Sequence, residues 1–229
     1  PFDDIRVRKA LNFAVDRATF VKATLEGVGE PAFMNLPSSH WAYDAEVAKL
    51  YPHDPDKARA LLKEANIPQG FELDLIGYTD QDSVRREEIL IEQFAKVGLK
   101  AKFTNGSIAE MIAAFFGRDK KGAGLLSAWT GRPDPSLTYT LIYTKESYFT
   151  AGGADLPADL PDALKATRIT ENIDERKKAF SKVQRIVMEN ALVCPLAFQF
   201  ELDALSAKVK GFKPNLLGKP KYEGVWLEG

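Results

Sequence analysis

Cysteine and histidine are nearly absent from this chain, and their scarcity excludes several kinds of site. Cys194 is the only cysteine in 229 residues, so no internal disulfide and no CxxC metal or redox motif can form. It lies in an apolar run, 192–196, where we expect a buried and unreactive thiol. His40 and His53 are the only histidines and have no partners at ligand spacing, so no zinc site is predicted.

Long apolar runs and the common nucleotide and nucleophile motifs are missing too. No stretch approaches about 18 consecutive apolar residues, so no membrane span is predicted. The sequence contains no GxSxG, P-loop or GxGxxG motif, and we expect no cofactor. The chain begins with Pro1-Phe2 and shows no signal peptide, which indicates a processed product or an excised fragment.

An excess of positive charge is also lacking. The chain has 31 basic and 32 acidic residues, a net charge of −1, so nothing indicates a nucleic-acid partner. Three basic clusters lie in helical or loop segments mixed with acids and are expected to be solvated faces. They are Arg85-Arg86, Lys120-Lys121 and Arg176-Lys177-Lys178.

What is present is an alternation of helical and strand-like segments, typical of an α/β protein. Asp54 and Pro55 give a clear helix start, and Ser107 to Glu110 match a capping box. The order strand, helix, strand, helix, strand from 71 to 129 favours right-handed crossovers and an open sheet. Predicted helices cover 5–26, 55–65, 83–97, 107–116, 161–169 and 174–187, the last capped by Asp174; predicted strands cover 71–76, 99–103, 124–129, 192–200 and 203–209. The tail beyond them shows no clear element.

The segment 127–135 has the composition of a binding loop. Trp129 offers a large flat apolar face, Gly131 allows close backbone approach, and Arg132 brings a forked cation. Binding residues tend to lie on loops held by a rigid scaffold. The alternative is that Trp129 is core packing and Pro-Asp-Pro a simple turn.

Several segments in order resemble family 5 extracellular solute-binding proteins, the peptide- and oligopeptide-binding receptors of ABC importers. Residues 4–17 read DIRVRKALNFAVDR, 51–65 read YPHDPDKARALLKEA, and 94–101 read FAKVGLKA, each similar to a segment of that family. The loop around Trp129 and the segments 174–187, 195–196 and 209–212 complete the order. The resemblance covers nearly the whole chain.

The resemblance implies a lobe like those of type II periplasmic binding proteins, with a mixed central sheet flanked by helices. It implies that 1–207 form the second, C-terminal ligand-binding lobe and that 208–229 return to an N-terminal lobe absent from this sequence. It further implies a binding protein rather than an enzyme, periplasmic or extracellular and membrane-anchored. Its partners would be a small peptide-like solute, the N-terminal lobe and a membrane permease.

In that family the loop after the Trp strand faces the cleft, so the resemblance makes Trp129, Thr130, Gly131, Arg132 and Asp134 the candidate ligand-binding residues. Many members have, three residues after the Trp, an Asp that pairs with a peptide α-amino group. Here Arg132 stands at that position, and a cation favours a carboxylate or phosphate on the solute. For Arg132 the alternative is a surface ion pair, and for Asp134 it is a cap on the segment that follows.

Three other functions stay open at this stage. A receptor of the same family could feed a chemosensor instead of a transporter. A hydrolase or transferase domain would require two carboxylates that converge in a pocket. An interaction module would show a flat, apolar face. Trp41 and Tyr43 are expected either to line the cleft or to pack on the absent lobe.

Overall fold

The computed structural model describes residues 1–118, 120–150, 156–215 and 220–229. Its helices are α1 (Ile5–Ala14), α2 (Arg17–Leu25), η1 (Val47–Lys49, a 3-10 turn), α3 (Pro55–Glu64), α4 (Gln81–Ala95), α5 (Ile108–Phe116), α6 (Pro135–Tyr143), α7 (Leu160–Ala166) and α8 (Ile173–Glu189). Its strands are β1 (Gly29–Pro31), β2 (Phe71–Tyr78), β3 (Leu99–Gly106), β4 (Gly124–Leu125), β5 (Ala197–Gln199), β6 (Val209–Lys210) and β7 (Trp226–Leu227).

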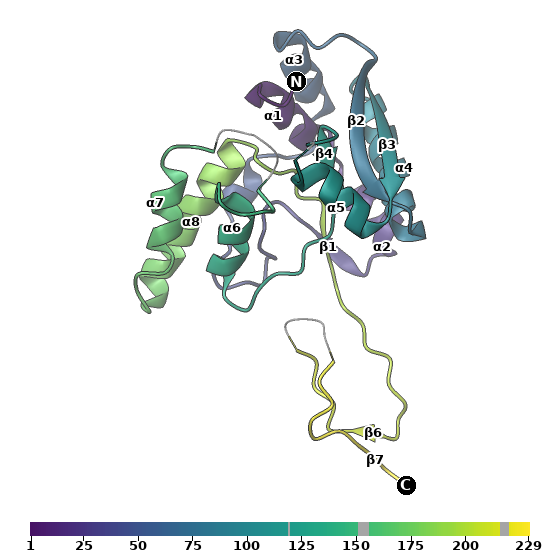
Figure 1. Cartoon of the computed structure of the whole chain (residues 1–229), viewed down its shortest axis with the longest axis vertical. Helices are drawn as coiled ribbons and strands as arrows, with labels where there is room; N and C mark the ends of the chain where they lie inside the picture. Colours follow the sequence, from purple (N-terminus) through teal and green to yellow (C-terminus); the bar gives the residue numbers. More distant parts are fainter. Residues whose placement is uncertain (119, 151–155, 216–219) are drawn as a thin grey trace.

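The largest sheet of the described residues is a three-stranded parallel sheet with the strand order β3-β2-β4. The β2–β3 register runs from Phe71 opposite Leu99 to Tyr78 opposite Gly106. Figure 1 shows α4 behind this sheet and α5 in front of it. With the antiparallel pairs β1–β5 and β6–β7, the molecule is an α/β fold with mixed sheets flanked by helices, and the predicted fold class is confirmed.

The predicted strand 124–129 is wrong in its length, because β4 ends at Leu125. One further backbone hydrogen bond joins the Leu126 N–H to the Ile76 carbonyl at 2.9 Å. After it, the contact between the chains is made by side chains, with the Tyr78 hydroxyl 3.0 Å from Ser127 Oγ. The last backbone hydrogen bond to the sheet is therefore made three residues before Trp129, so Trp129 lies in the loop and not in the strand.

The predicted single helix 5–26 is two helices, broken at Val15–Asp16. The Asp16 carboxylate caps the second helix by accepting from the Thr19 N–H at 3.0 Å. The break also turns Arg17 into the interior, where its Nε donates to the carbonyls of Ala32 and Pro195, each at 2.8 Å. Burial lowers the pKa of this guanidinium. Hydrogen bonds to distant residues, and not the local helical pattern, therefore decide where the first helix ends.

Other boundaries divide into confirmed and corrected ones. The Asp54 cap and the Ser107–Glu110 capping box are both present. The last long helix is capped by Asn172 rather than by Asp174, which lies in its first turn. The predicted strands 192–200 and 203–209 shrink to β5 and to a strand that begins only at Val209. The tail, in contrast, does form an element, since β6 pairs with β7.

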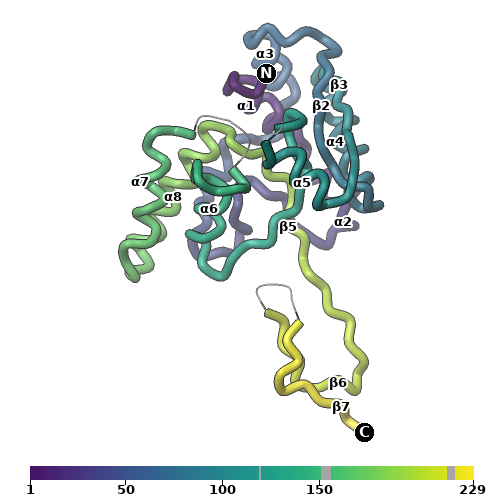
Figure 2. Tube along the Cα trace, viewed as in Figure 1, coloured from purple at the N-terminus to yellow at the C-terminus, as the bar shows by residue number. Residues whose placement is uncertain are grey.

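One contiguous hydrophobic core joins the sheet region to the helices α6–α8. Its largest fully buried side chains include Tyr139, Tyr143 and Phe180. The C-terminal arm, defined as residues 201–215 and 220–229, extends away from this body (Figures 1 and 2). No helix in the described part of the chain has the length and apolar character needed to cross a membrane.

Candidate functional site

The Trp129 loop lies beyond the carboxyl ends of the parallel strands. The chain passes from the central strand β2 to β3 on one side of it and then crosses to β4 on the other side. The order of the strands therefore reverses at β2. In open α/β sheets, ligands bind outside the carboxyl ends of the strands at such a reversal. The loop that follows β4 therefore has the position expected of a binding loop.

Trp129 is neither buried nor free of contacts. Its side chain is 39% exposed, which contradicts the alternative of plain core packing. Its ring meets the Phe149 ring edge-on, with centroids 5.2 Å apart and an interplanar angle of 76°. One part of the indole is thus held by protein, and the rest can meet a ligand.

The next two residues are exposed and loosely surrounded. Thr130 and Gly131 both lie at the surface. A Cβ built on Gly131 would meet only Thr138 Oγ1, at 3.9 Å. Within the described residues, therefore, no neighbour demands glycine at position 131, and the space that they leave around it is open to a partner.

Arg132 is fixed by its backbone while its charge stays exposed. Its N–H donates to Thr138 Oγ1 at 2.8 Å. The structure gives its guanidinium no ion pair with any described residue. The surface ion pair that was the alternative to a ligand contact therefore finds no partner within the described ranges.

Asp134 is the N-cap of α6, as one of its two interpretations predicted. Its carboxylate accepts from the Ser136 N–H at 2.9 Å and pairs with the Arg176 guanidinium at 2.8 Å. Burial by itself would raise the pKa of Asp134, but the hydrogen bonds from Ser136 and Arg176 outweigh it and hold that pKa below its usual value. The Asp134 carboxylate is thus already occupied within the chain.

Arg176 was missed by the sequence analysis, which assigned it to a solvated basic cluster. Its side chain is only 16% exposed, and its NH2 group donates to both Asp134 oxygens, at 2.9 and 2.8 Å. Its Nε donates to the Thr167 carbonyl at 3.0 Å, and its Cζ lies 5.3 Å from the centroid of the Trp41 ring. The available signal was Phe180, one helical turn later on the same face.

Trp41 packs against Arg176, whose pair with Asp134 we call the clamp. Its ring is 36% exposed and meets Phe180 edge-on at 5.5 Å, with the His40 ring 5.5 Å away on another side. Burial lowers the pKa of His40. Trp41 therefore contacts Arg176, which in turn pairs with Asp134 at the end of the Trp129 loop. These contacts within the chain cover part of the Trp41 surface.

Metal binding and thiol chemistry find no support in the described part of the chain. The described residues contain no group of three or more His, Cys, Asp or Glu side chains that could hold a metal ion. Cys194 is a free thiol whose pKa burial raises. A hollow of about 350 Å³ lies between Pro1, the first half of β2 and Gly122, at the amino ends of the strands and thus at the opposite end from Trp129.

The fold matches structures of periplasmic binding proteins. It superposes on the dipeptide binding protein of Pseudoalteromonas sp. SM9913, solved in complex with Met-Leu, with a TM-score of 0.85 and 21% identity; the match covers 100% of this chain and 46% of that one.

The chain belongs to the bacterial extracellular solute-binding proteins, family 5 Middle, whose model matches residues 1–150. It is 33% identical over 240 residues to heme-binding protein A of Haemophilus influenzae and 28% identical over 236 residues to the dipeptide-binding protein of Escherichia coli. Each match covers 100% of this chain but only 43% and 44% of those proteins, so the chain spans less than half of their length. These homologues are binding proteins and not enzymes.

Proposed function

We propose that this chain is one lobe of a two-lobed solute-binding receptor of an ABC importer. The lobe closes with the remainder of the protein on a small peptide-like solute and presents the closed complex to a membrane permease. The receptor works in the periplasm or, membrane-anchored, outside the cell. Family membership supports this role, and so does the fraction of each relative, about half, that the chain spans.

The lobe comprises residues 1–207, and 208–229 return to the remainder of the protein. The arm supports this division, because the hydrogen bonds recorded for its described residues join parts of the arm to each other. In one of them the Glu228 N–H donates to the Lys208 carbonyl at 2.8 Å. Five large apolar side chains of the arm are 48–74% exposed, and three of them, Tyr222, Trp226 and Leu227, lie in 208–229; the other two are Leu202 and Leu205. Apolar surface of this kind is typical of a segment that packs against another part of its protein.

The solute carries an acidic group near Arg132. One observation supports this proposal above all: the only carboxylate of the loop, Asp134, is already paired with Arg176, whereas the Arg132 guanidinium has no ion pair within the described residues. The loop therefore offers an uncompensated cation to the solvent. Such a cation attracts a carboxylate and can bind it through two hydrogen bonds.

The other candidate residues have different roles in this proposal. Trp129 supplies an apolar wall beside the acidic group, and Gly131 lets the solute approach the backbone. Thr130 adds an exposed hydroxyl. Asp134 shapes the loop as the helix cap rather than binding the solute, because its oxygens are taken by Ser136 and Arg176.

The experiment uses the complete receptor, from which native mass spectrometry identifies any solute that copurifies. Titration calorimetry then compares Arg132→Ala with Arg168→Ala, which removes the same charge from an exposed arginine outside the loop. For an acidic solute we expect Arg132→Ala to weaken binding about 10- to 100-fold, the value of one charge-assisted contact. Equal affinity in the two variants would overturn the assignment of Arg132.

A further inference from the structure

Five aromatic rings from three separate segments meet beside the Trp129 loop, and we call them the aromatic cluster. Phe116 is central, with its ring 4.9 Å from Phe115, 6.1 Å from Tyr148 and 5.5 Å from Phe149. Phe149 contacts Tyr148 at 5.3 Å and Trp129 at 5.2 Å. Four of the five pairs are edge-on, the arrangement that aromatic rings favour over flat stacking.

The aromatic cluster is not part of the buried core. Trp129 is 39% and Tyr148 52% exposed. The helix that supplies Phe115 and Phe116, α5, is strongly apolar in sequence yet contains no buried residue. An edge-on cluster leaves ring faces and edges open, so a further ring can join it without displacing those already present.

Two of the segments that supply the aromatic cluster also bring a cation. Arg132 shares the loop of Trp129, three residues further along. Lys120 donates its ammonium proton to the Phe116 carbonyl at 3.1 Å, which places that charge at the end of α5. A partner that enters the cluster therefore meets positive charge next to apolar surface.

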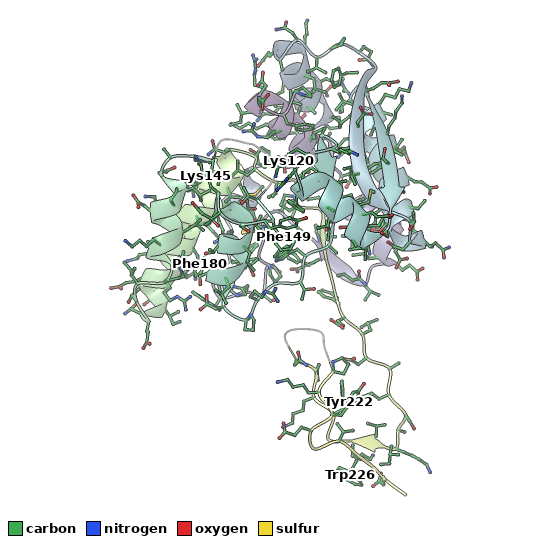
Figure 3. The ribbon with its side chains drawn as sticks, viewed as in Figure 1. Lys120, Lys145, Phe149, Phe180, Tyr222 and Trp226 are labelled. Atoms are coloured by element: carbon green, nitrogen blue, oxygen red, sulfur yellow. The ribbon has the colours of Figure 1, made fainter. Side chains whose placement is uncertain are left out.

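The third segment brings one charge of each sign. Lys145 and Glu146 precede the two rings Tyr148 and Phe149. Figure 3 shows Phe149 between α5 and α6. The charge that the structure places directly on α5 is thus the Lys120 ammonium, and with Arg132 in the Trp129 loop it complements an acidic partner.

We propose that the aromatic cluster is a subsite for an aromatic ring of the solute, so that the transported solute carries both a ring and an acidic group. This inference rests on the proposed function, since it assigns a substrate class to the same cleft. The occupant is the solute and not a further apolar part of the protein, because a purely apolar segment would leave Arg132 and Lys120 without a complement at the rim. The carboxylate of the solute lies toward Arg132, and its ring joins the free edge of the Trp129–Phe149 pair.

The test measures affinities of the complete receptor for three dipeptides that differ at one side chain: Phe-Asp, Leu-Asp and Ala-Asp. Leucine controls for apolar area without an aromatic face. Since an added aromatic pair contributes beyond its buried area, we expect Phe-Asp to bind about 2- to 10-fold more tightly than Leu-Asp. In Phe149→Leu that ratio falls toward one, while the control Ile169→Ser, at a 72% exposed residue outside the cluster, keeps it.

The outcomes separate the two proposals. Equal binding of Phe-Asp and Leu-Asp, or a ratio that survives Phe149→Leu, overturns the aromatic subsite and leaves the binding receptor standing. The same holds if only the aliphatic acidic peptides bind, which would mean that another part of the protein covers the aromatic cluster. Failure of all three peptides, together with the absence of any copurifying solute, overturns the proposed function and the subsite with it.

Discussion

Replacement of Arg176 by methionine should loosen the end of the Trp129 loop and destabilise the lobe. The change removes two hydrogen bonds to Asp134 and one to the Thr167 carbonyl, while the methionine retains most of the stem beneath Trp41. Hydrogen bonds to charged groups contribute about 1.5–3 kcal/mol, and the breaking of a fully buried pair costs about 3–5 kcal/mol. The Asp134 side chain is 41% exposed, so water replaces part of what is lost. We expect a loss of about 2–3 kcal/mol, or roughly 5–10 °C in the midpoint of unfolding for a lobe of this size.

A double-mutant cycle with Asp134→Asn isolates the pair, because asparagine keeps an acceptor for the Ser136 N–H. Denaturant unfolding at neutral pH should give a coupling of about 1–2 kcal/mol. Arg185→Met is the matched control on the same helix: its partner Glu189 is 3.5 Å away and both side chains are about half exposed, so its effect should stay within about 0.5 kcal/mol. Because the folded pKa of Asp134 is lowered, the coupling is present above the ordinary aspartate pKa and is lost as pH falls through the lowered value. A coupling below about 0.5 kcal/mol at neutral pH would refute the clamp.

Two further substitutions test the scaffold. Glu87 is 4% exposed and its Oε1 has no hydrogen-bond partner, so burial raises its pKa although a hydrogen bond from Asn105 opposes the shift. Glu87→Gln should therefore raise the unfolding midpoint at pH 8, where the folded carboxylate is charged. It should give no gain at low pH, where Glu87 is neutral in both the folded and the unfolded state. A gain of equal size at both values would contradict the burial argument. Ser107→Ala removes the capping box of α5 and should cost about 1 kcal/mol in thermal unfolding followed by circular dichroism, whereas Ser39→Ala, at an exposed serine outside any cap, should change nothing.

Sequence alone was sufficient where the signal is local. The Asp54-Pro55 start and the Ser107–Glu110 box involve side chains within a few residues of the backbone that they cap, so the structure reproduces them. The alternation 99–103 likewise predicted β3. These elements position the parallel sheet, and the sheet in turn fixes the end at which the Trp129 loop must lie.

The errors arose where distant partners decide the outcome. The break before Arg17 depends on the Pro195 carbonyl, 178 positions away, and no local helical pattern contains that information. The Asp134–Arg176 pair spans 42 positions, and it withdraws Arg176 from a basic cluster whose sequence resembles a solvated face. The sequence did not predict the aromatic cluster for the same reason, since its rings come from three segments that only the fold brings together.

The clamp also bears on selectivity, because Arg176 cancels the charge of Asp134 two residues from Arg132. In Arg176→Met the Asp134 carboxylate loses its partner and its field opposes that of Arg132, so the complete receptor should bind an acidic solute more weakly. The double variant Arg176→Met/Asp134→Asn has no free carboxylate, so its affinity should recover while its stability stays low. A purely structural clamp predicts a different pattern, in which affinity follows stability across the wild type and the two variants. Titration calorimetry at neutral pH, repeated at high salt to screen the exposed charges, distinguishes the two. An affinity that fails to recover in the double variant would exclude charge cancellation as a basis of the proposed preference for an acidic solute.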